Sequence, residues 1–264
     1  MAGYIKERQA RQVRALRQAW QVAPKLAIIA TADHPAIEIY MRMKHRYGDD
    51  ILIDVDIHRI EQADAPKLIK QLNEDDTVHG IIVQLPLADP SQTDEIVNLV
   101  APEKDVDALG KDAIFEPATP MAIMWLLAGY NVDLNGKNVV LVGRGKLVGA
   151  PLEKILKASF VDVKVIDSQT KDADKIIADA DVIITATGQP GLIKTDSIKY
   201  GAVVVDAGVA GEQGKTVGDL DQAVYDRDDL TITPQKGGVG PLTICALFDN
   251  VIRAARRVAD AKAQ

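Results

Sequence analysis

Short apolar runs alternate with amphipathic stretches along the whole chain. In the first half, three segments are predicted to be strands, at residues 26–30, 51–57 and 80–84. The second has an apolar residue at every other position, as in a half-exposed strand, whereas the other two are continuously apolar and predict buried strands. Amphipathic segments predict helices at 36–47, 65–72 and 94–100. Strands separated by helices of this length indicate parallel βαβ units.

The second half repeats this alternation around a different centre. A wholly apolar strand at 139–142 leads into a glycine-rich turn at 143–149, and Pro151 can open the helix that follows at its first position. Further strands are predicted at 162–166, 182–187, 202–205 and 230–233, and helices at 121–128, 151–158 and 242–261. The chain is therefore predicted to be an α/β protein with two domains joined near residues 112–120.

The first 20 residues are rich in arginine and contain a single acid, Glu7, which faintly resembles a transit peptide. The segment has no serine, however, and its apolar residues have roughly helical spacing: Ile5, Val13, Leu16 and Trp20. This spacing favours a structural first helix. We therefore expect a cytoplasmic protein.

Composition narrows the function classes. The 264 residues carry a formal net charge of -7, which weighs against nucleic-acid or membrane-surface binding because both usually need a basic face. Cys245 is the one cysteine, so no internal disulfide can form, and the four histidines have no metal-ligand spacing. No apolar run is long enough to span a bilayer. We expect neither a metal nor a membrane partner.

The turn at 143–149 has the context that gives a glycine pattern meaning, because it lies between a strand and a helix. Glycines let the backbone approach a pyrophosphate, whose charge suits a helix N-terminus. The spacing is a variant, GxGxxxG, and the alternative is a tight turn in a domain that binds no ligand. The predicted cofactor-binding residues here are Gly143, Arg144, Gly145, Lys146, Val148 and Gly149.

The choice between NAD and NADP stays open at this stage. Asp167 lies eighteen residues beyond Gly149, at the end of the next predicted strand, where an acid can accept hydrogen bonds from the adenosine ribose of NAD. Arg144 and Lys146 instead favour a 2'-phosphate and hence NADP. Thr187 and Gly188 follow another strand and would also face the cofactor crevice.

Four further features could form a substrate site. Tyr40 and Lys44 share a face of a predicted helix, where burial could make the lysine a general base, although such a pair is more often a surface contact. Gln84 ends a buried strand and either points into a crevice or caps the strand. Asp105 and Asp107 would share a face of an extended segment and reach one site, or form a solvated acidic loop. The glycine-rich segment 237–241 either approaches a ligand or is merely a turn.

Taken together and in this order, these motifs closely resemble the bifunctional methylenetetrahydrofolate dehydrogenase/cyclohydrolase family. The resemblance covers roughly residues 24–255 and rests on Tyr40-x-x-x-Lys44, the sequences VQLPL (83–87) and KDVD (104–107), Pro117-x-Thr119-Pro120, the phosphate turn and GGVGPLT (237–243). It implies a Rossmann-type NAD(P)-binding domain at 119–241 and a smaller α/β folate domain at 1–118, completed by a C-terminal helix at 242–264.

The resemblance also implies a reaction and roles for residues. Members oxidise 5,10-methylenetetrahydrofolate by hydride transfer to NAD(P) and hydrolyse the methenyl product to 10-formyltetrahydrofolate. Lys44 would be the acid/base lysine, tuned by Gln84, with Tyr40 near the folate and Asp107 on the pterin ring. The expected folate-pocket residues are Leu85, Gly238, Val239 and Pro241. Positions that match the NADP phosphate contacts are Arg144, Gly145 and Ser168, and Thr187 and Gly188 would flank the rest of the cofactor.

The chain departs from the family pattern at several positions. Gly145 stands where serine is usual, Asp167 where histidine is frequent, Ala108 where glycine is usual, and Ile37 where serine is usual. The first two weaken the expectation of NADP, and a homodimer through the cofactor domains is expected only by resemblance. Two alternatives remain: a dehydrogenase of another small metabolite, such as a shikimate-type enzyme, and an inactive NAD(P)-binding scaffold.

Overall fold

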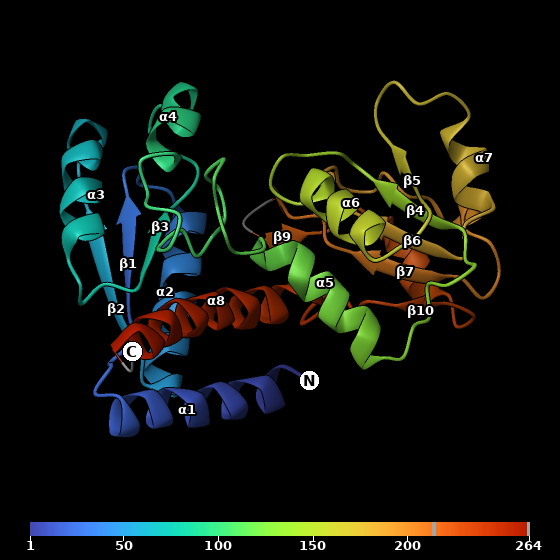
Figure 1. The fold of residues 1–264 in the computed structure, drawn as a ribbon. Helices are drawn as coiled ribbons and strands as arrows, with labels where there is room; N and C mark the ends of the chain where they lie inside the picture. The colour runs from blue at the N-terminus through green and yellow to red at the C-terminus, as the bar shows by residue number, and fades with distance from the viewer. Residues whose placement is uncertain (213–214, 263–264) are drawn as a thin grey trace. The chain divides into compact units, whose positions relative to one another are not determined.

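The computed structural model describes residues 1–212 and 215–262 of the chain. It contains two compact units, Met1–Ala118 with Ile244–Gln264 and Thr119–Thr243. Each unit is built on its own parallel sheet (Figure 1). The predicted two-domain α/β fold is therefore confirmed.

The first unit has a three-stranded parallel sheet in the order β2-β1-β3. Its strands are β1 (Lys25–Ala30), β2 (Asp54–Arg59) and β3 (Gly80–Val83). Its helices are α1 (Ala2–Ala19), α2 (Pro35–Ile51), α3 (Ala65–Glu74), α4 (Thr93–Val97) and most of α8 (Val239–Lys262). β1 is buried almost throughout, because α3 and α4 pack on Ala27 and Ile29 of one sheet face while the opposite side chains, Leu26 and Ile28, are equally buried. This double coverage explains its continuously apolar sequence.

The predicted strand at 51–57 is wrong at its start. Ile51 is the last residue of α2, and Leu52 has a left-handed backbone with φ of 67°. The amide of Ile53 donates to the Gly48 carbonyl at 2.9 Å, which closes the helix end, and β2 begins only at Asp54. Ile51 and Ile53 are buried, but by the helix end and the turn after it. Their alternation imitated a strand because both positions face the core.

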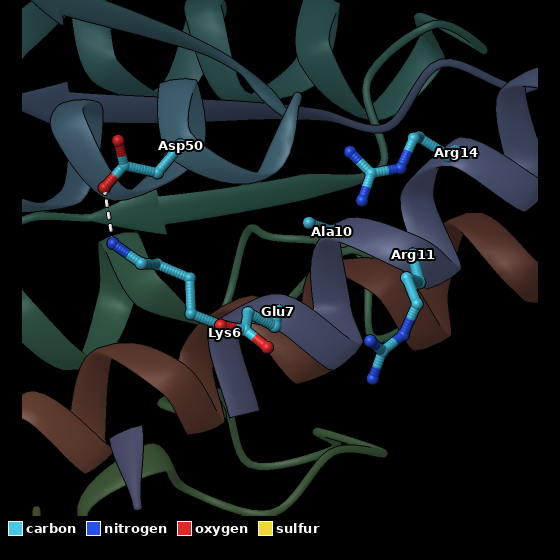
Figure 2. Close-up of a pocket in the computed structure, with 6 residues that line it drawn as sticks. All are labelled: Lys6, Glu7, Ala10, Arg11, Arg14 and Asp50. Carbon is cyan, nitrogen blue, oxygen red and sulfur yellow. Dashed lines mark hydrogen bonds and ion pairs between the residues drawn. The ribbon is translucent and has the colours of Figure 1, made fainter. Parts of the chain in front are cut away.

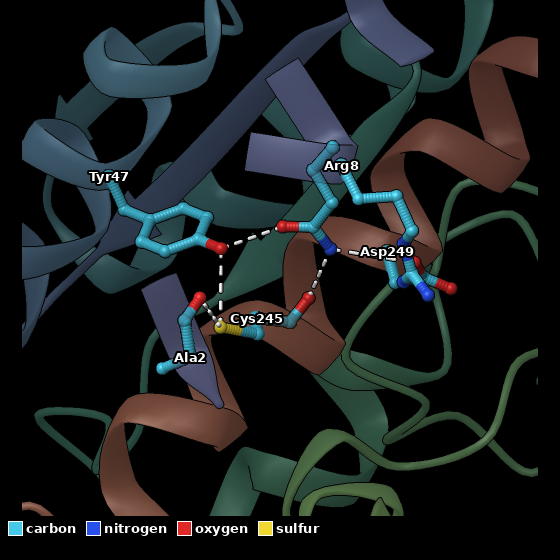
Figure 3. A network of polar contacts seen from close by, with 6 residues as sticks. Ala2, Arg8, Tyr47, Cys245 and Asp249 are labelled. Carbon is cyan, nitrogen blue, oxygen red and sulfur yellow. Dashed lines mark hydrogen bonds and ion pairs between the residues drawn. The ribbon is translucent and has the colours of Figure 1, made fainter. Parts of the chain in front are cut away.

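A buried polar network joins α1, α2 and α8 within the first unit (Figure 3). The Tyr47 hydroxyl lies 2.7 Å from Oε1 of Gln9 and 3.2 Å from Sγ of Cys245. The amide nitrogen of Gln9, a fully buried residue, donates to the Cys245 carbonyl at 2.8 Å, and Arg8 pairs with Asp249 at 3.0 Å. Burial raises the pKa of Tyr47, so its hydroxyl stays protonated and available to donate. The predicted first helix is confirmed, and this network fixes it to the unit.

The second unit has a five-stranded parallel sheet in the order β10-β7-β6-β4-β5. Its strands are β4 (Val139–Val142), β5 (Val163–Ile166), β6 (Val182–Thr185), β7 (Val203–Asp206) and β10 (Thr231–Ile232). Its helices are α5 (Ala118–Gly129), α6 (Gly149–Ala158) and α7 (Ala173–Ala178), and β8 (Ala210–Glu212) pairs antiparallel with β9 (Lys215–Val217). β5 and β6 lie on opposite sides of β4, so the order in which successive strands are added reverses between β4 and β6, although all the strands are parallel. In open α/β sheets, ligands bind beyond the carboxyl ends of the strands at such a point.

Two local predictions about this unit need correction. α6 begins at Gly149, so Pro151 is its third residue and not its first; a helix has no use for the amide proton at either position. α8 begins at Val239, so Val239, Gly240 and Pro241 form its first turn and not a loop. The sequence analysis also missed α7 and the β8–β9 pair, which are short and lack a clear period.

Candidate active site and dinucleotide site

Lys44 and Gln84 meet at the carboxyl edge of the first unit's sheet. Lys44 lies on α2, which follows β1, and Gln84 directly follows β3. Nζ of Lys44 donates to Oε1 of Gln84 at 2.9 Å. The Gln84 amide nitrogen donates in turn to the Leu85 carbonyl at 3.0 Å, which fixes the oxygen toward the lysine. Two residues that are forty positions apart in the sequence are thus joined by a hydrogen bond, and Gln84 does more than cap the end of the strand.

Burial lowers the pKa of Lys44 from its ordinary value, while the negative charge of Asp107 acts in the opposite direction. The neutral amide oxygen of Gln84 accepts the lysine's hydrogen bond without adding a charge that would hold the proton. A lysine in these surroundings exchanges its proton nearer to neutral pH than an exposed lysine does. That property is the one a general acid or base requires.

Asp107 lies in a turn that follows a single bridge to β3. Asp105 forms an isolated parallel bridge with Ile81, and the chain turns directly after it, because the Ala108 amide donates to the Asp105 carbonyl at 3.2 Å. Lys104 anchors the segment by donating to three carbonyls at the end of α3, at 2.8 to 2.9 Å. The bridge and these hydrogen bonds hold the KDVD segment beside β3, and the charge of Asp107 acts on Lys44.

Asp105 has a different environment from Asp107. It is buried, and its carboxylate accepts the amides of Leu109 at 3.3 Å and Gly110 at 2.8 Å. The prediction that both aspartates reach one site is therefore wrong for Asp105, which orders the loop after Asp107. Ala108 in that loop has φ of 57°, in the left-handed region that favours glycine. This left-handed backbone explains why the family pattern has glycine at this position.

Tyr40 lies one helical turn before Lys44 and is 38% exposed. Burial of part of the ring raises its pKa, so the hydroxyl is protonated near neutral pH. Leu85 is half-buried, and the peptide bond between Leu85 and Pro86 is cis. Ile37, where the family usually has serine, is a buried core residue in α2.

The phosphate turn of the second unit closes tightly between β4 and α6. Gly143 has φ of 101°, and its amide donates to the Ile166 carbonyl at 2.8 Å. A Cβ added at Gly149 would overlap the Gly143 carbonyl, so this position accepts only glycine. A Cβ at Gly145 would meet nothing within 4 Å, so serine would fit there. Val148 is the N-cap residue before α6 and Lys146 is exposed on the turn. The backbone and the helix N-terminus together form a cradle of the kind that holds a pyrophosphate.

Arg144 and Asp167 lie just after the neighbouring strands β4 and β5, and the charge of Arg144 acts on Asp167. Nε of Arg144 donates to Glu153 of α6 at 2.9 Å, and the arginine side chain is 60% exposed. The Asp167 carboxylate accepts the Gln169 amide at 3.0 Å and the Thr170 hydroxyl at 2.9 Å. These hydrogen bonds and the nearby Arg144 lower the pKa of Asp167, which keeps it ionised. Ser168 beside it is exposed.

Thr187 and Gly188 follow β6 at the point where the sheet reverses. A Cβ at Gly143 would meet the Thr187 methyl at 2.9 Å, so the two turns touch. Gly188 has φ of 67° and opens the chain away from the strand. Gly238, Val239 and Pro241, predicted from the sequence to line the folate pocket, lie at the start of α8 in this second unit, whereas Lys44, Gln84 and Asp107 belong to the first.

A separate hollow of about 410 Å³ lies along α1 and the end of α2, lined by Lys6, Glu7, Ala10, Arg11, Arg14 and Asp50 (Figure 2). Lys6 is already paired with Asp50 at 2.7 Å. The hollow contains none of the predicted site residues. Its arginines are the exposed face of the arginine-rich first helix.

Sequence reasoning missed two acids that organise the cofactor side. Glu153 is buried and receives both Arg144 and Lys157, and its spacing of four from Lys157 was a readable signal. Asp219 is fully buried and accepts the amides of Thr187 and Gln189, with no local signal beyond the Gly218-Asp219 pair. Within residues 1–212 and 215–262, no group of three or more His, Cys, Asp or Glu side chains could hold a metal ion, and no helix of that part is both long and apolar enough to cross a bilayer.

A parallel sheet with an intact phosphate turn, on the same chain as a unit with a half-buried lysine that donates to a glutamine, defines a two-domain nicotinamide-dependent oxidoreductase. The chain belongs to the tetrahydrofolate dehydrogenase/cyclohydrolase family: residues 1–107 match its catalytic domain and residues 117–259 match its NAD(P)-binding domain. The second unit is thus an NAD(P)-binding domain.

Individual relatives agree over nearly the full length. The chain is 40% identical over 251 residues to the bifunctional protein FolD of Moorella thermoacetica, covering 89% of each chain. The crystal structure of the bifunctional methylenetetrahydrofolate dehydrogenase/cyclohydrolase from Campylobacter jejuni is 34% identical, with a TM-score of 0.90 and coverage of 97% of this chain and 96% of that one. The Trypanosoma brucei enzyme, solved with NADP and an inhibitor, is 29% identical with a TM-score of 0.90, covering 97% and 95%.

Proposed function

We propose that this protein oxidises 5,10-methylenetetrahydrofolate by hydride transfer to NAD(P) and hydrolyses the methenyl product to 10-formyltetrahydrofolate. The observation that carries the proposal is the hydrogen bond of 2.9 Å between Lys44 and Gln84, in a member of this family whose phosphate turn is intact. An inactive scaffold has no need to keep a lysine partly desolvated and oriented. A dehydrogenase of another metabolite has no need of the hydrolytic pair.

The cofactor-side residues fit a dinucleotide. In the turn at 143–149, Gly149 packs against the Gly143 carbonyl without room for a Cβ, Gly145 borders open space, and the N-terminus of α6 attracts an anion. Gly143, Gly145, Val148 and Gly149 would hold the pyrophosphate, with Lys146 on the same turn. NAD(P) supplies the hydride acceptor when it is bound. The chain's part in this step is to align the two molecules and exclude water.

The folate side has to tolerate and then resolve a cation. Hydride leaves a carbon flanked by two nitrogens, which share the positive charge that develops. Lys44 in its neutral form does not repel this cation, and the carboxylate of Asp107 offsets its charge and can accept hydrogen bonds from the pterin. Tyr40 and Leu85 would pack on the folate. The methenyl cation thus lies beside a neutral amine and a negative carboxylate, which stabilise its charge.

Hydrolysis needs a base for the attacking water and a proton donor for the folate nitrogen. Neutral Lys44 can take the water's proton at Nζ and later deliver it, while Gln84 holds the amine in place. Because burial lowers the lysine's pKa, a larger fraction of the enzyme carries the neutral base near neutral pH. One side chain therefore serves both directions of proton transfer.

Replacing the base tests this assignment. Lys44→Met should lower the hydrolysis of methenyltetrahydrofolate by about 100-fold or more, the usual contribution of a positioned acid or base, and leave dinucleotide affinity within about twofold. Lys67→Met, at an exposed lysine of α3, is the matched control and should change neither quantity. Hydrolysis by Lys44→Met at the wild-type rate would refute the assignment. Wild-type protein inactive with both NAD and NADP would favour the scaffold.

NADP is the proposed cofactor, with NAD as the close alternative. Among the described residues, the Arg144 guanidinium pairs with Glu153 through Nε alone, and its outer nitrogens could then contact a 2'-phosphate. The charge of Asp167 opposes this, but the adjacent Arg144 and the turn hydrogen bonds partly offset it. Arg144→Ala should lower kcat/KM for NADP by about 10-fold and change that for NAD little. Asp167→Ala should improve NADP use relative to NAD, and an unchanged ratio would remove Asp167 from the cofactor argument.

We also propose a homodimer formed through the NAD(P)-binding domains. Family membership supports it, together with two strongly exposed aromatic residues of this unit, Phe160 at 97% and Tyr200 at 84%. Light scattering during size-exclusion chromatography should give twice the chain mass of 28.5 kDa. Tyr200→Lys should shift the mass toward the monomer, and a monomeric wild type would end the proposal.

A further inference from the structure

We infer that Asp219 is a positioning residue for the dinucleotide, acting through the loop that follows β6. The inference rests on the proposed dehydrogenase function. Asp219 is fully buried, and its carboxylate accepts three hydrogen bonds from one short segment. Oδ2 accepts the hydroxyl of Thr185 and the amide of Thr187, the latter at 2.7 Å, and Oδ1 accepts the amide of Gln189 at 2.9 Å. The end of β6 and both sides of Gly188 are therefore tied to one side chain.

This loop is where the cofactor crevice is expected. β4 and β6 are the two strands between which the sheet order reverses, and the loop leaves the carboxyl end of β6. Its Thr187 lies against Gly143 of the phosphate turn. Asp219 holds the Thr187 and Gln189 amides, and the Gln189 amide also donates to the Thr187 hydroxyl at 3.1 Å, so the loop keeps one conformation. A preordered loop binds a ligand without paying an ordering cost.

A second carboxylate locks Asp219 in place. The amides of Asp219 and Gly208 donate to Oδ1 of Asp206 at 3.1 and 2.9 Å, and the Tyr225 hydroxyl donates to its Oδ2 at 3.0 Å. The two aspartates also pack reciprocally on glycines: a Cβ at Gly208 would overlap the Asp219 carboxylate, and a Cβ at Gly218 would overlap that of Asp206. This interlocked arrangement leaves the Asp219 carboxylate one position.

Burying the Asp219 carboxylate costs free energy of desolvation, and fixing the loop after β6 explains why the residue is an aspartate. All the hydrogen bonds of the Asp219 carboxylate within the described residues come from neutral donors, and a buried carboxylate without a cation loses its hydration for amide and hydroxyl contacts alone. A neutral, well-packed side chain would stabilise the unit at least as well. An ionised carboxylate, by contrast, accepts from several backbone amides at once, which is what fixing a loop requires.

Asp219→Asn tests the inference because it keeps the shape and replaces one acceptor by a donor. Asp181→Asn is the matched control, since Asp181 directly precedes β6 and also accepts a backbone amide, that of Asn138 at 2.8 Å, but at the opposite end of the strand. Dissociation constants of NADP and NAD are measured by quenching or calorimetry on the full chain. Amide hydrogen exchange of the loop is measured without cofactor, and hydrolysis of methenyltetrahydrofolate without dinucleotide.

Asp219→Asn should raise the dissociation constant of the dinucleotide by about 10-fold, as expected for the loss of one or two hydrogen bonds to a charged group. The Thr187 and Gln189 amides should exchange faster, and hydrolysis should stay within about twofold of wild type. Asp181→Asn should change none of the three. Gly208→Ala, which displaces the carboxylate without removing it, should weaken dinucleotide binding in the same way and serves if Asp219→Asn fails to fold.

Unchanged dinucleotide affinity in a folded Asp219→Asn protein would overturn the inference, and so would a proportional loss of hydrolysis and binding in both aspartate variants, which would indicate a general structural role. The proposed function fails by a separate result. Wild-type protein that binds neither dinucleotide would refute the dehydrogenase, whatever the exchange rates of the loop in the variants.

Discussion

The backbone at Ala108 offers a quantitative test of how the loop after Asp107 is built. Ala108 has φ of 57°, and a left-handed conformation costs an L-residue with a Cβ about 1–2 kcal/mol. Glycine removes that cost but has more freedom in the unfolded chain, worth about 0.4–1 kcal/mol. Removing a half-buried methyl subtracts a few tenths more. Ala108→Gly should therefore stabilise the protein by about 0.5 kcal/mol.

The same substitution in a helix has the opposite sign and provides the control. Ala15 is exposed on α1, in the same unit, and glycine there should cost about 1 kcal/mol. Calorimetric melting should thus raise Tm by about 1–2 °C for Ala108→Gly and lower it by about 2–4 °C for Ala15→Gly. The difference of about 1.5 kcal/mol between two identical chemical changes isolates the backbone contribution. If Ala108→Gly lowered Tm as Ala15→Gly does, the reasoning about the left-handed turn would be wrong.

Three further outcomes follow from the structure. The rate of methenyl hydrolysis should rise with pH as Lys44 loses its proton, with an apparent pKa below the ordinary 10.5. Asp107→Asn should move that rise to lower pH, because the negative charge of Asp107 raises the pKa of Lys44. A pH profile of kcat measures both effects, and a rise centred at or above 10.5 would contradict the role of burial. Gly149→Ala should weaken dinucleotide binding by about 10-fold or more, because its methyl group would overlap the Gly143 carbonyl. Gly145→Ala, whose methyl group meets open space, should bind the dinucleotide as the wild type does. Equal dissociation constants for the two variants would contradict the turn geometry. Tyr47→Phe should lower the free energy of unfolding by about 2 kcal/mol, because it leaves the buried oxygen of Gln9 without its donor. An unchanged midpoint in denaturant titration would show that the network of Figure 3 does not stabilise the fold.

Much of the fold was readable from local pattern. The strand at 139–142 was predicted to the residue, and the strands at 26–30 and 80–84 within one residue at an end. These strands are buried on both faces, so their composition is continuously apolar and unambiguous. The prediction failed at 51–57, where the burial of Ile51 and Ile53 comes from a helix end. Alternation reports which positions are buried, and a helix end followed by a turn can bury the same positions as a strand.

The site residues were identified one by one, but their partners were not. Lys44 and Gln84 were identified as candidates, yet their hydrogen bond joins α2 to the end of β3 and depends on sheet order. Asp105 and Asp107 looked equivalent in sequence, and the pairing of Asp105 with Ile81 makes one a loop anchor and leaves the other beside Lys44. Glu153 and Asp219 were missed because acids on a helix or in a loop are usually solvated, and only packing shows that these two are buried.

The sequence by itself determined the two α/β units, the phosphate turn and the family, because each depends on residue types at short, fixed spacings. Backbone preference, apolar periodicity and the need for glycine at a tight turn all act over a few residues. The tertiary structure alone decided which acids are buried, which nitrogen meets which oxygen, and which way the pKa of Lys44 moves. Those properties depend on desolvation and on neighbours from distant segments, and neither exists until the strands and helices have packed.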